Sequence, residues 1–111
     1  MLGNEEMIPE LKRPWETVDS AAAERLAAEL SRELGPAHPL YKKKVRAVAA
    51  RCDCDDALFI LDGELSCAVV HLTYTGKQEP PKWPETHIFA SIDDWVRDCM
   101  IPDHEDYHAG E

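Results

Sequence analysis

No part of this sequence is apolar over a long distance. None of its hydrophobic runs approaches the ~18 residues that a membrane-spanning helix needs. The first residues, MLGNEEMIPELKRPWE, carry two glutamates before any basic residue and lack the apolar core of a secretory signal. We therefore expect a cytoplasmic protein with no membrane partner. With 111 residues, the chain has room for one hydrophobic core, since two separate cores would each be marginal.

Positive charge is also scarce. Twelve Lys and Arg residues stand against 22 Asp and Glu, and the formal net charge is −10 at pH 7. Nucleic-acid binding depends on cations that neutralise phosphates, so this balance predicts no nucleic-acid partner. We interpret the basic cluster between residues 42 and 51 as a charged edge strand, with a basic binding patch as the alternative. Its members are Lys42, Lys43, Lys44, Arg46 and Arg51.

The four cysteines form neither a disulfide framework nor a complete zinc motif. Cys67 lies in an apolar run, where a thiol behaves as a small hydrophobe. Cys52 and Cys54 belong to the segment CDCDD, whose C-x-C spacing lacks the second ligand pair of a structural zinc site. We predict reduced thiols, no cofactor and an acidic turn at CDCDD, with a metal site there as the alternative.

Local patterns predict an α+β fold. Residues 20–34 carry apolar side chains at helical spacing between the N-cap candidate Asp19 and the stop signal Gly35-Pro36. A strand is expected from residue 42 onward, and a second helix over 92–100, ended by Pro102. These elements predict a single domain in which an antiparallel sheet of three or four strands is packed by two helices.

A hairpin is predicted at ALFILDGELSCAVVHLTYT, because Asp62-Gly63 is favoured in two-residue type I′ turns. Such a turn would pair Leu61 with Glu64 and place alternate residues on opposite faces. One face would carry Leu58, Ile60, Leu65, Cys67, Val69 and His71. The other would carry Phe59, Leu61, Ala68, Val70, Leu72 and Tyr74. Both faces are apolar, as in a sheet covered on two sides.

The two ends of the chain show no sustained period. We predict an extended N-terminal arm over residues 1–18, the α+β domain over 19–102 and an acidic C-terminal tail over 103–111, lying on the surface or disordered. The arm residues expected to dock on the domain are Ile8, Leu11 and Trp15.

Two histidine patterns bear on chemistry. His71 could be a general base or a metal ligand, but its place on an apolar strand face favours a core residue held by one hydrogen bond. HEDYH, from His104 to His108, has the H-E-x-x-H spacing of zinc proteases. Because it follows a proline in a polar tail, we expect no zinc catalysis there, while adventitious metal binding by His104 and His108 stays open.

The loop GKQEPPKWP, residues 76–84, is the predicted binding surface. Its prolines stiffen the chain, and Trp83 is expected to pack on the end of the sheet with one edge exposed. Lys77 and Lys82 would form a positive rim beside it, and His71 completes the set of predicted binding residues.

The segment HPLYKKKVRAVAARCDCDDALFIL, together with AVVHLTYTGKQEPPKWPETHIF, resembles a group of uncharacterised small bacterial proteins that share a VHLTW-x-GK…WP pattern. The likeness covers residues 38–107, and Tyr74 stands where the pattern has tryptophan. The resemblance implies a bacterial, cytoplasmic α+β domain and assigns no activity.

From these features we expect a non-catalytic protein-binding module with a protein partner. One alternative is an immunity-type inhibitor that covers a basic toxin with its acidic surface. Another is a metal-dependent enzyme that uses His71 or the CDCDD segment. No catalytic or metal-ligating residue is assigned, because no second polar group is placed at a diagnostic distance from His71 in the sequence. The pattern leaves the oligomeric state open.

Overall fold

The computed structural model describes residues 9–63, 65–80 and 82–109. Its centre is one five-stranded antiparallel sheet in the order β1-β2-β3-β4-β5, so each strand pairs with the next along the chain. The strands are β1 (Trp15–Thr17), β2 (Val45–Arg51), β3 (Asp56–Leu61), β4 (Cys67–His71) and β5 (Glu85–Phe89). The sheet therefore has five strands, where the sequence predicted three or four.

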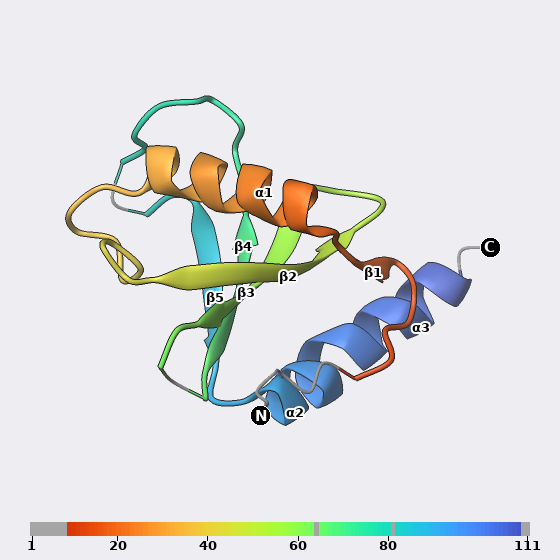
Figure 1. Cartoon of the computed structure of the whole chain (residues 1–111). Helices are drawn as coiled ribbons and strands as arrows, with labels where there is room; N and C mark the ends of the chain where they lie inside the picture. Colours follow the sequence, from red (N-terminus) through yellow and green to blue (C-terminus); the bar gives the residue numbers. More distant parts are fainter. Residues whose placement is uncertain (1–8, 64, 81, 110–111) are drawn as a thin grey trace.

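Helices cover both faces of this sheet (Figure 1). The helix α1 (Ser20–Glu33) lies on one face, and a helical rod lies against the other. The rod consists of α2 (Ile92–Trp95), the π-helical turn η1 (Val96–Met100) and α3 (Ile101–Ala109). The predicted α+β class and the predicted packing of a sheet by two helices are confirmed. None of the helices in the described ranges is long and apolar enough to cross a membrane.

The face under α1 holds the larger core. Asp19 caps α1 by accepting a hydrogen bond from Ala22 N at 2.8 Å, and the apolar stripe of the helix then meets the sheet. The buried residues of this core are Leu30, Leu34, Leu40, Ala47, Ala57, Phe59, Leu61, Ala68, Val70 and Leu72. The core on the rod face is Trp15, Ala49, Leu58, Cys67, Val69, Trp95 and Met100. The predicted division of the β3–β4 hairpin into two apolar faces is thus confirmed for its buried residues.

The hairpin register differs from the prediction by two residues. Ile60 pairs with Cys67, and Leu61 N donates to Ser66 O at 3.1 Å, so the loop is longer than a two-residue turn. Type I′ geometry needs a left-handed residue at both central positions, whereas here only Gly63 of the Asp62-Gly63 pair has a positive φ. A shift of two keeps every strand residue on its predicted face. Leu65, which was expected on the same face as Leu58 and Val69, lies in the loop and is 86% exposed.

The basic cluster does not lie on an edge strand. β2 is paired on both sides, with β1 and β3, because the chain at Trp15–Thr17 adds a strand outside it. The predicted arm over 1–18 is therefore partly a strand of the sheet, and the buried indole of Trp15 holds it there. The three consecutive lysines precede β2 in a turn. Ile8 lies outside the described residues.

The second helix does not end at Pro102. In a regular α-helix the proline ring would clash with the carbonyl four residues earlier. Here the helix widens immediately before it, since Ile101 N donates to Val96 O across the π-helical turn. The predicted tail is helical to Ala109 and is docked on the domain, because Asp103 Oδ2 accepts a hydrogen bond from Trp15 Nε1 at 2.9 Å.

Candidate functional site

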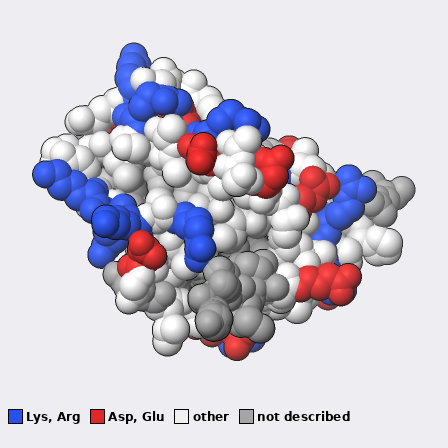
Figure 2. Space-filling view, in the orientation of Figure 1, with Lys and Arg blue, Asp and Glu red and all other residues white. Residues whose placement is uncertain are grey.

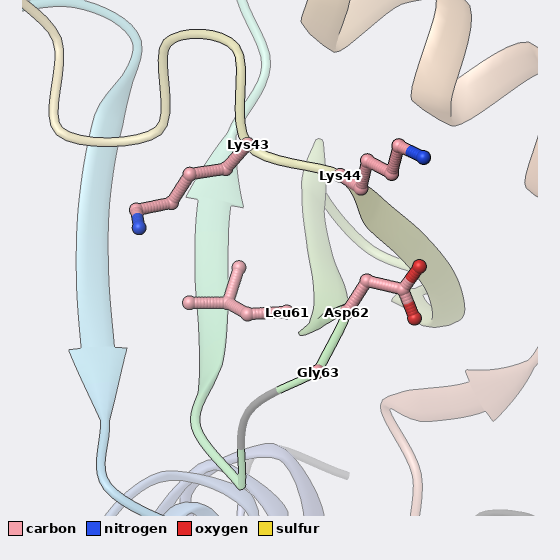
Figure 3. A pocket seen from close by; sticks show the side chains of 5 residues that line it. All are labelled: Lys43, Lys44, Leu61, Asp62 and Gly63. Atoms are coloured by element: carbon pink, nitrogen blue, oxygen red, sulfur yellow. The ribbon is translucent and has the colours of Figure 1, made fainter.

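Three surface hollows lie around the turn before β2 and around α1. The first has a volume of about 490 Å³ and is lined by Lys43, Lys44, Leu61, Asp62 and Gly63. Figure 3 shows Lys43 and Lys44 pointing in opposite directions above Leu61 and Asp62. The apolar floor of this hollow thus lies between two cationic side chains.

The second hollow is larger, at about 550 Å³, and lies between α1 and the turn before β2. Its lining residues are Ala27, Leu30, Ser31, Arg32, Leu34, Tyr41, Lys42, Lys43, Val45 and Gln78. The ammonium of Lys42 lies 5.8 Å from the centroid of the Tyr41 ring, a cation–π contact that holds both side chains at the rim.

The third hollow, of about 490 Å³, lies on the other flank of α1. Its lining is mostly apolar, and the large polar side chains around it are Arg25, Glu29, Arg32 and Tyr74. The full lining is Val18, Ala22, Arg25, Leu26, Ala28, Glu29, Arg32, Ala50 and Tyr74.

Neighbouring hollows share lining residues: Lys43 lines the first and second, and Arg32 lines the second and third. We call the cations in the three linings the basic band: Arg25, Arg32, Lys42, Lys43 and Lys44. In Figure 2, Lys and Arg side chains gather on the left and upper parts of the face, over the turn before β2 and around α1. The acidic residues in the lining are Asp62 and Glu29, and Glu29 is paired with Arg32 at 2.7 Å.

A buried histidine fixes the turn that carries the lysines. His38 Nδ1 accepts a hydrogen bond from Leu40 N at 3.0 Å, so the proton of the neutral ring is on Nε2. That nitrogen donates to Pro84 O at 3.0 Å, at the start of β5. The turn before β2 is therefore hydrogen-bonded to the residue that precedes β5, an edge strand of the sheet. Sequence reasoning did not single out His38, whose partners are a backbone amide two residues away and a carbonyl 46 residues away.

Two buried carboxyl groups on α1 hold the start of the loop after β4. Both oxygens of Glu33 accept hydrogen bonds from Thr73 N, at 3.0 and 3.1 Å, and Glu33 Oε2 also accepts one from Tyr74 N at 2.8 Å. Glu29 accepts a bond from Gly76 N at 3.3 Å. The start of the loop after β4 is thus held by carboxylates that reach out from the helix.

Glu29 and Glu33 have opposite protonation tendencies. Burial raises the pKa of Glu33, and its hydrogen bond with Glu29 raises it further. The same bond lowers the pKa of Glu29, which Arg32 also favours in its ionised form. Both shifts favour the proton on Glu33, from where it can be donated to an ionised Glu29. The helical spacing of α1 places Glu29 and Glu33 largely off its apolar stripe, where solvated side chains are expected, but both are buried.

The predicted binding loop borders the basic band. Gln78 lines the second hollow, and Glu79 N donates to Glu33 O at 2.9 Å. Trp83 is 43% exposed, so more than half of its surface is covered, while Lys77 and Lys82 are exposed. Binding by Trp83, Lys77 and Lys82 stays a prediction.

His71 is not a core residue, so that expectation is wrong. The β3–β4–β5 register places it in one row between Asp56 and Glu85, at the end of the sheet. Its Nδ1 lies 2.6 Å from Asp56 Oδ1, and this hydrogen bond raises the pKa of the imidazole. It lines a hollow of about 200 Å³ with Asp56, Val69, Glu85 and His87. This lining contains no serine, threonine, cysteine or lysine that could act as a nucleophile. A binding role for His71 stays a prediction.

The other suggested metal sites have a simpler structure. Residues 52–55 form the predicted acidic turn between β2 and β3, and the four cysteines are free thiols. HEDYH lies in α3 rather than in an irregular tail, with the rings of His104 and His108 stacked 5.8 Å apart between centroids. Over residues 9–63, 65–80 and 82–109, no group of three or more His, Cys, Asp or Glu side chains is arranged to hold a metal ion.

No protein-family model, curated protein or solved structure matches this chain. The resemblance to small bacterial proteins therefore stays a prediction.

Proposed function

We propose that this protein is a non-catalytic protein-binding module whose basic band receives an acidic, extended segment of a partner protein. The observation that carries the proposal is that the cations of the band line three neighbouring hollows with partly apolar linings. Lys43 and Arg32 each line two of these hollows.

The linings of these hollows combine apolar and charged side chains, as protein interfaces do. Apolar side chains such as Leu30, Leu34 and Val45 lie in its lining and offer surface that a partner can cover. The rim cations are exposed, so each contributes at most about 1 kcal/mol as a pair, but together they steer an acidic partner toward the band.

The charge of the rest of the molecule adds specificity. A chain with 22 acidic and 12 basic residues repels an acidic segment over most of its surface. The basic band is therefore the region where such a segment can approach, and it also sets the orientation of binding. An immunity-type inhibitor of a basic toxin would use the acidic surface instead, so the charge of the preferred ligand distinguishes the two functions.

The test uses two labelled peptides of equal length, one alternating glutamate with leucine and the other lysine with leucine. Binding to the full chain is followed by fluorescence polarisation at low and at physiological salt. We expect only the glutamate peptide to bind, and its affinity to fall as salt rises. The band variant, Lys42→Glu, Lys43→Glu and Lys44→Glu together, should bind roughly tenfold more weakly or worse.

A matched control changes the same net charge elsewhere. Lys12→Glu, Arg13→Glu and Arg97→Glu alter three exposed cations outside the linings of the three hollows and outside the predicted binding loop, and should leave the affinity nearly unchanged. Equal weakening by both triple variants would reduce the effect to net charge and contradict the proposal. Preferential binding of the lysine peptide would contradict it in favour of an inhibitor of a basic partner.

A further inference from the structure

The third hollow differs from the other two in what lies beneath it. Small side chains from two elements leave space in its lining: Ala22 and Ala28 of α1, and Ala50 of β2. Leu26 and Val18 add apolar surface beside them. Its volume of about 490 Å³ is within the range of sites that accept a compact ligand group. The hollow is thus suited to a flat apolar side chain.

Tyr74 lines this hollow and has an unfavourable backbone conformation. Its φ is 57°, in the left-handed region that residues with a Cβ rarely adopt. The bonds that Thr73 N and Tyr74 N donate to the buried carboxyl of Glu33 keep the chain there. The side chain is nevertheless 53% exposed. The fold therefore fixes the backbone of an aromatic residue and leaves its ring open, a combination that reduces the entropy lost on binding.

Arg25 supplies a charge next to this ring. It lines the same hollow as Tyr74 and makes no ion pair among the residues that the structure describes. Burial, together with the charges of Asp55, Glu29 and Glu33, raises the pKa of the Tyr74 phenol, and Arg25 acts in the opposite direction. Because Arg32 is engaged by Glu29, Arg25 is the arginine of this lining that can pair with an incoming carboxylate.

We propose that the third hollow binds an aromatic side chain of the acidic partner segment, with an adjacent carboxylate of that segment facing Arg25. The inference rests on the proposed function, because Arg32 joins this hollow to the rest of the basic band and one continuous segment can cross both. The partner ring packs against the Tyr74 ring in an offset or edge-to-face arrangement. The recognised sequence is thus an aromatic residue flanked by acidic ones.

The experiment compares two labelled glutamate–leucine peptides that differ at one central position, which is phenylalanine in one and alanine in the other. Their affinities for the full chain are measured by fluorescence polarisation. We expect the phenylalanine peptide to bind roughly tenfold more tightly. Tyr74→Ala should abolish this preference, and Tyr74→Phe should keep it. Tyr41→Ala, which removes the aromatic ring of the second hollow, is the matched control and should also keep it.

A second variant guards against indirect effects of changes in the loop. Ala28→Leu fills the hollow from an exposed helix position, does not touch the bonds made by Glu33, and should also abolish the preference. If the preference survives both Tyr74→Ala and Ala28→Leu while the triple lysine variant still weakens binding, the inference is wrong and the proposed function stands. If neither peptide binds to the unaltered protein in a charge-dependent way, both are wrong.

Discussion

Different interactions hold the helices on the two faces of the sheet. On the rod face the contacts are mainly apolar and aromatic: the rings of Trp15 and Trp95 meet edge to face with centroids 5.2 Å apart, and both residues are buried. On the α1 face an apolar core is combined with a buried carboxyl pair, Glu29 and Glu33, that holds the loop after β4. The first arrangement depends on packing and the second also on protonation.

The difference follows from what each helix must hold. The rod packs on the sheet and needs surface area, which two large indoles supply. Helix α1 must also hold a loop whose backbone amides would otherwise be buried without acceptors, and a carboxylate can accept several amides at once. The basic band lies beside α1, so the polar attachment and the candidate binding surface share one side of the molecule. Four predictions test this comparison.

The largest expected effect is on the rod face. Trp95→Ala removes a fully buried indole and should lower the free energy of unfolding by about 3–5 kcal/mol, measured by urea denaturation. Trp83→Ala is the comparison, because Trp83 is the exposed tryptophan of the predicted binding loop, and it should cost clearly less. Equal losses for the two variants would mean that Trp83 belongs to the core as much as Trp95 does.

On the α1 face, chemistry should matter more than size. Glu33→Ala leaves the amides of Thr73 and Tyr74 without their acceptor and should cost about 2–4 kcal/mol. Glu33→Gln keeps an acceptor for both amides and a donor toward Glu29, so it should be nearly neutral at low pH. Thermal melts and hydrogen exchange of the Thr73 and Tyr74 amides measure the difference. Similar losses for alanine and glutamine would show that the protonated carboxyl is not the species in the fold.

The same pair predicts a pH dependence. The folded pKa of Glu33 is raised, so the native state binds the proton more tightly than the unfolded chain. Its contribution to stability is therefore present below the ordinary value of 4.5 and is lost as the pH rises through the raised folded value. Glu33→Gln cannot lose that proton, so its stability relative to the unaltered protein should increase over this window. Parallel curves of unfolding free energy against pH would contradict the assignment.

The smallest effect is expected at the exposed histidine on the rod side. Asp56→Asn removes the carboxylate that raises the pKa of His71, so that pKa should fall back toward 6.5 in an NMR titration. The ion pair stabilises the fold below the unfolded pKa of histidine and loses this effect as the pH rises through the raised folded value. Because His71 is half-exposed, the change in stability should be about 1 kcal/mol or less. Asp55→Asn is the control, and an equal fall in the pKa there would point to general charge rather than to the direct bond.

Much of the fold follows from local patterns. The helical spacing of apolar residues before Gly35 predicts α1, because one turn of helix relates residues three and four apart. Alternation along 57–72 predicts which side chains share a face of the hairpin, and that result survives an incorrect turn because a shift of two preserves the alternation. Within the candidate site, the run Lys42–Lys44 suggested a basic patch, although only as an alternative to an edge strand.

Other features were decided by contacts between distant parts of the chain. Trp15 bonds to Asp103, 88 residues away, and this contact belongs to a packing that turns the predicted arm into a strand and the predicted tail into a helix. The sequence by itself determined the elements, the alternation of their faces and the excess of acidic charge. Only the tertiary structure decided that Glu33 is buried and bonded to the amides of Thr73 and Tyr74, and that the cations of the basic band line neighbouring hollows. Local spacing reports which side a residue faces along its own element, whereas burial and charge pairing depend on which other element packs there.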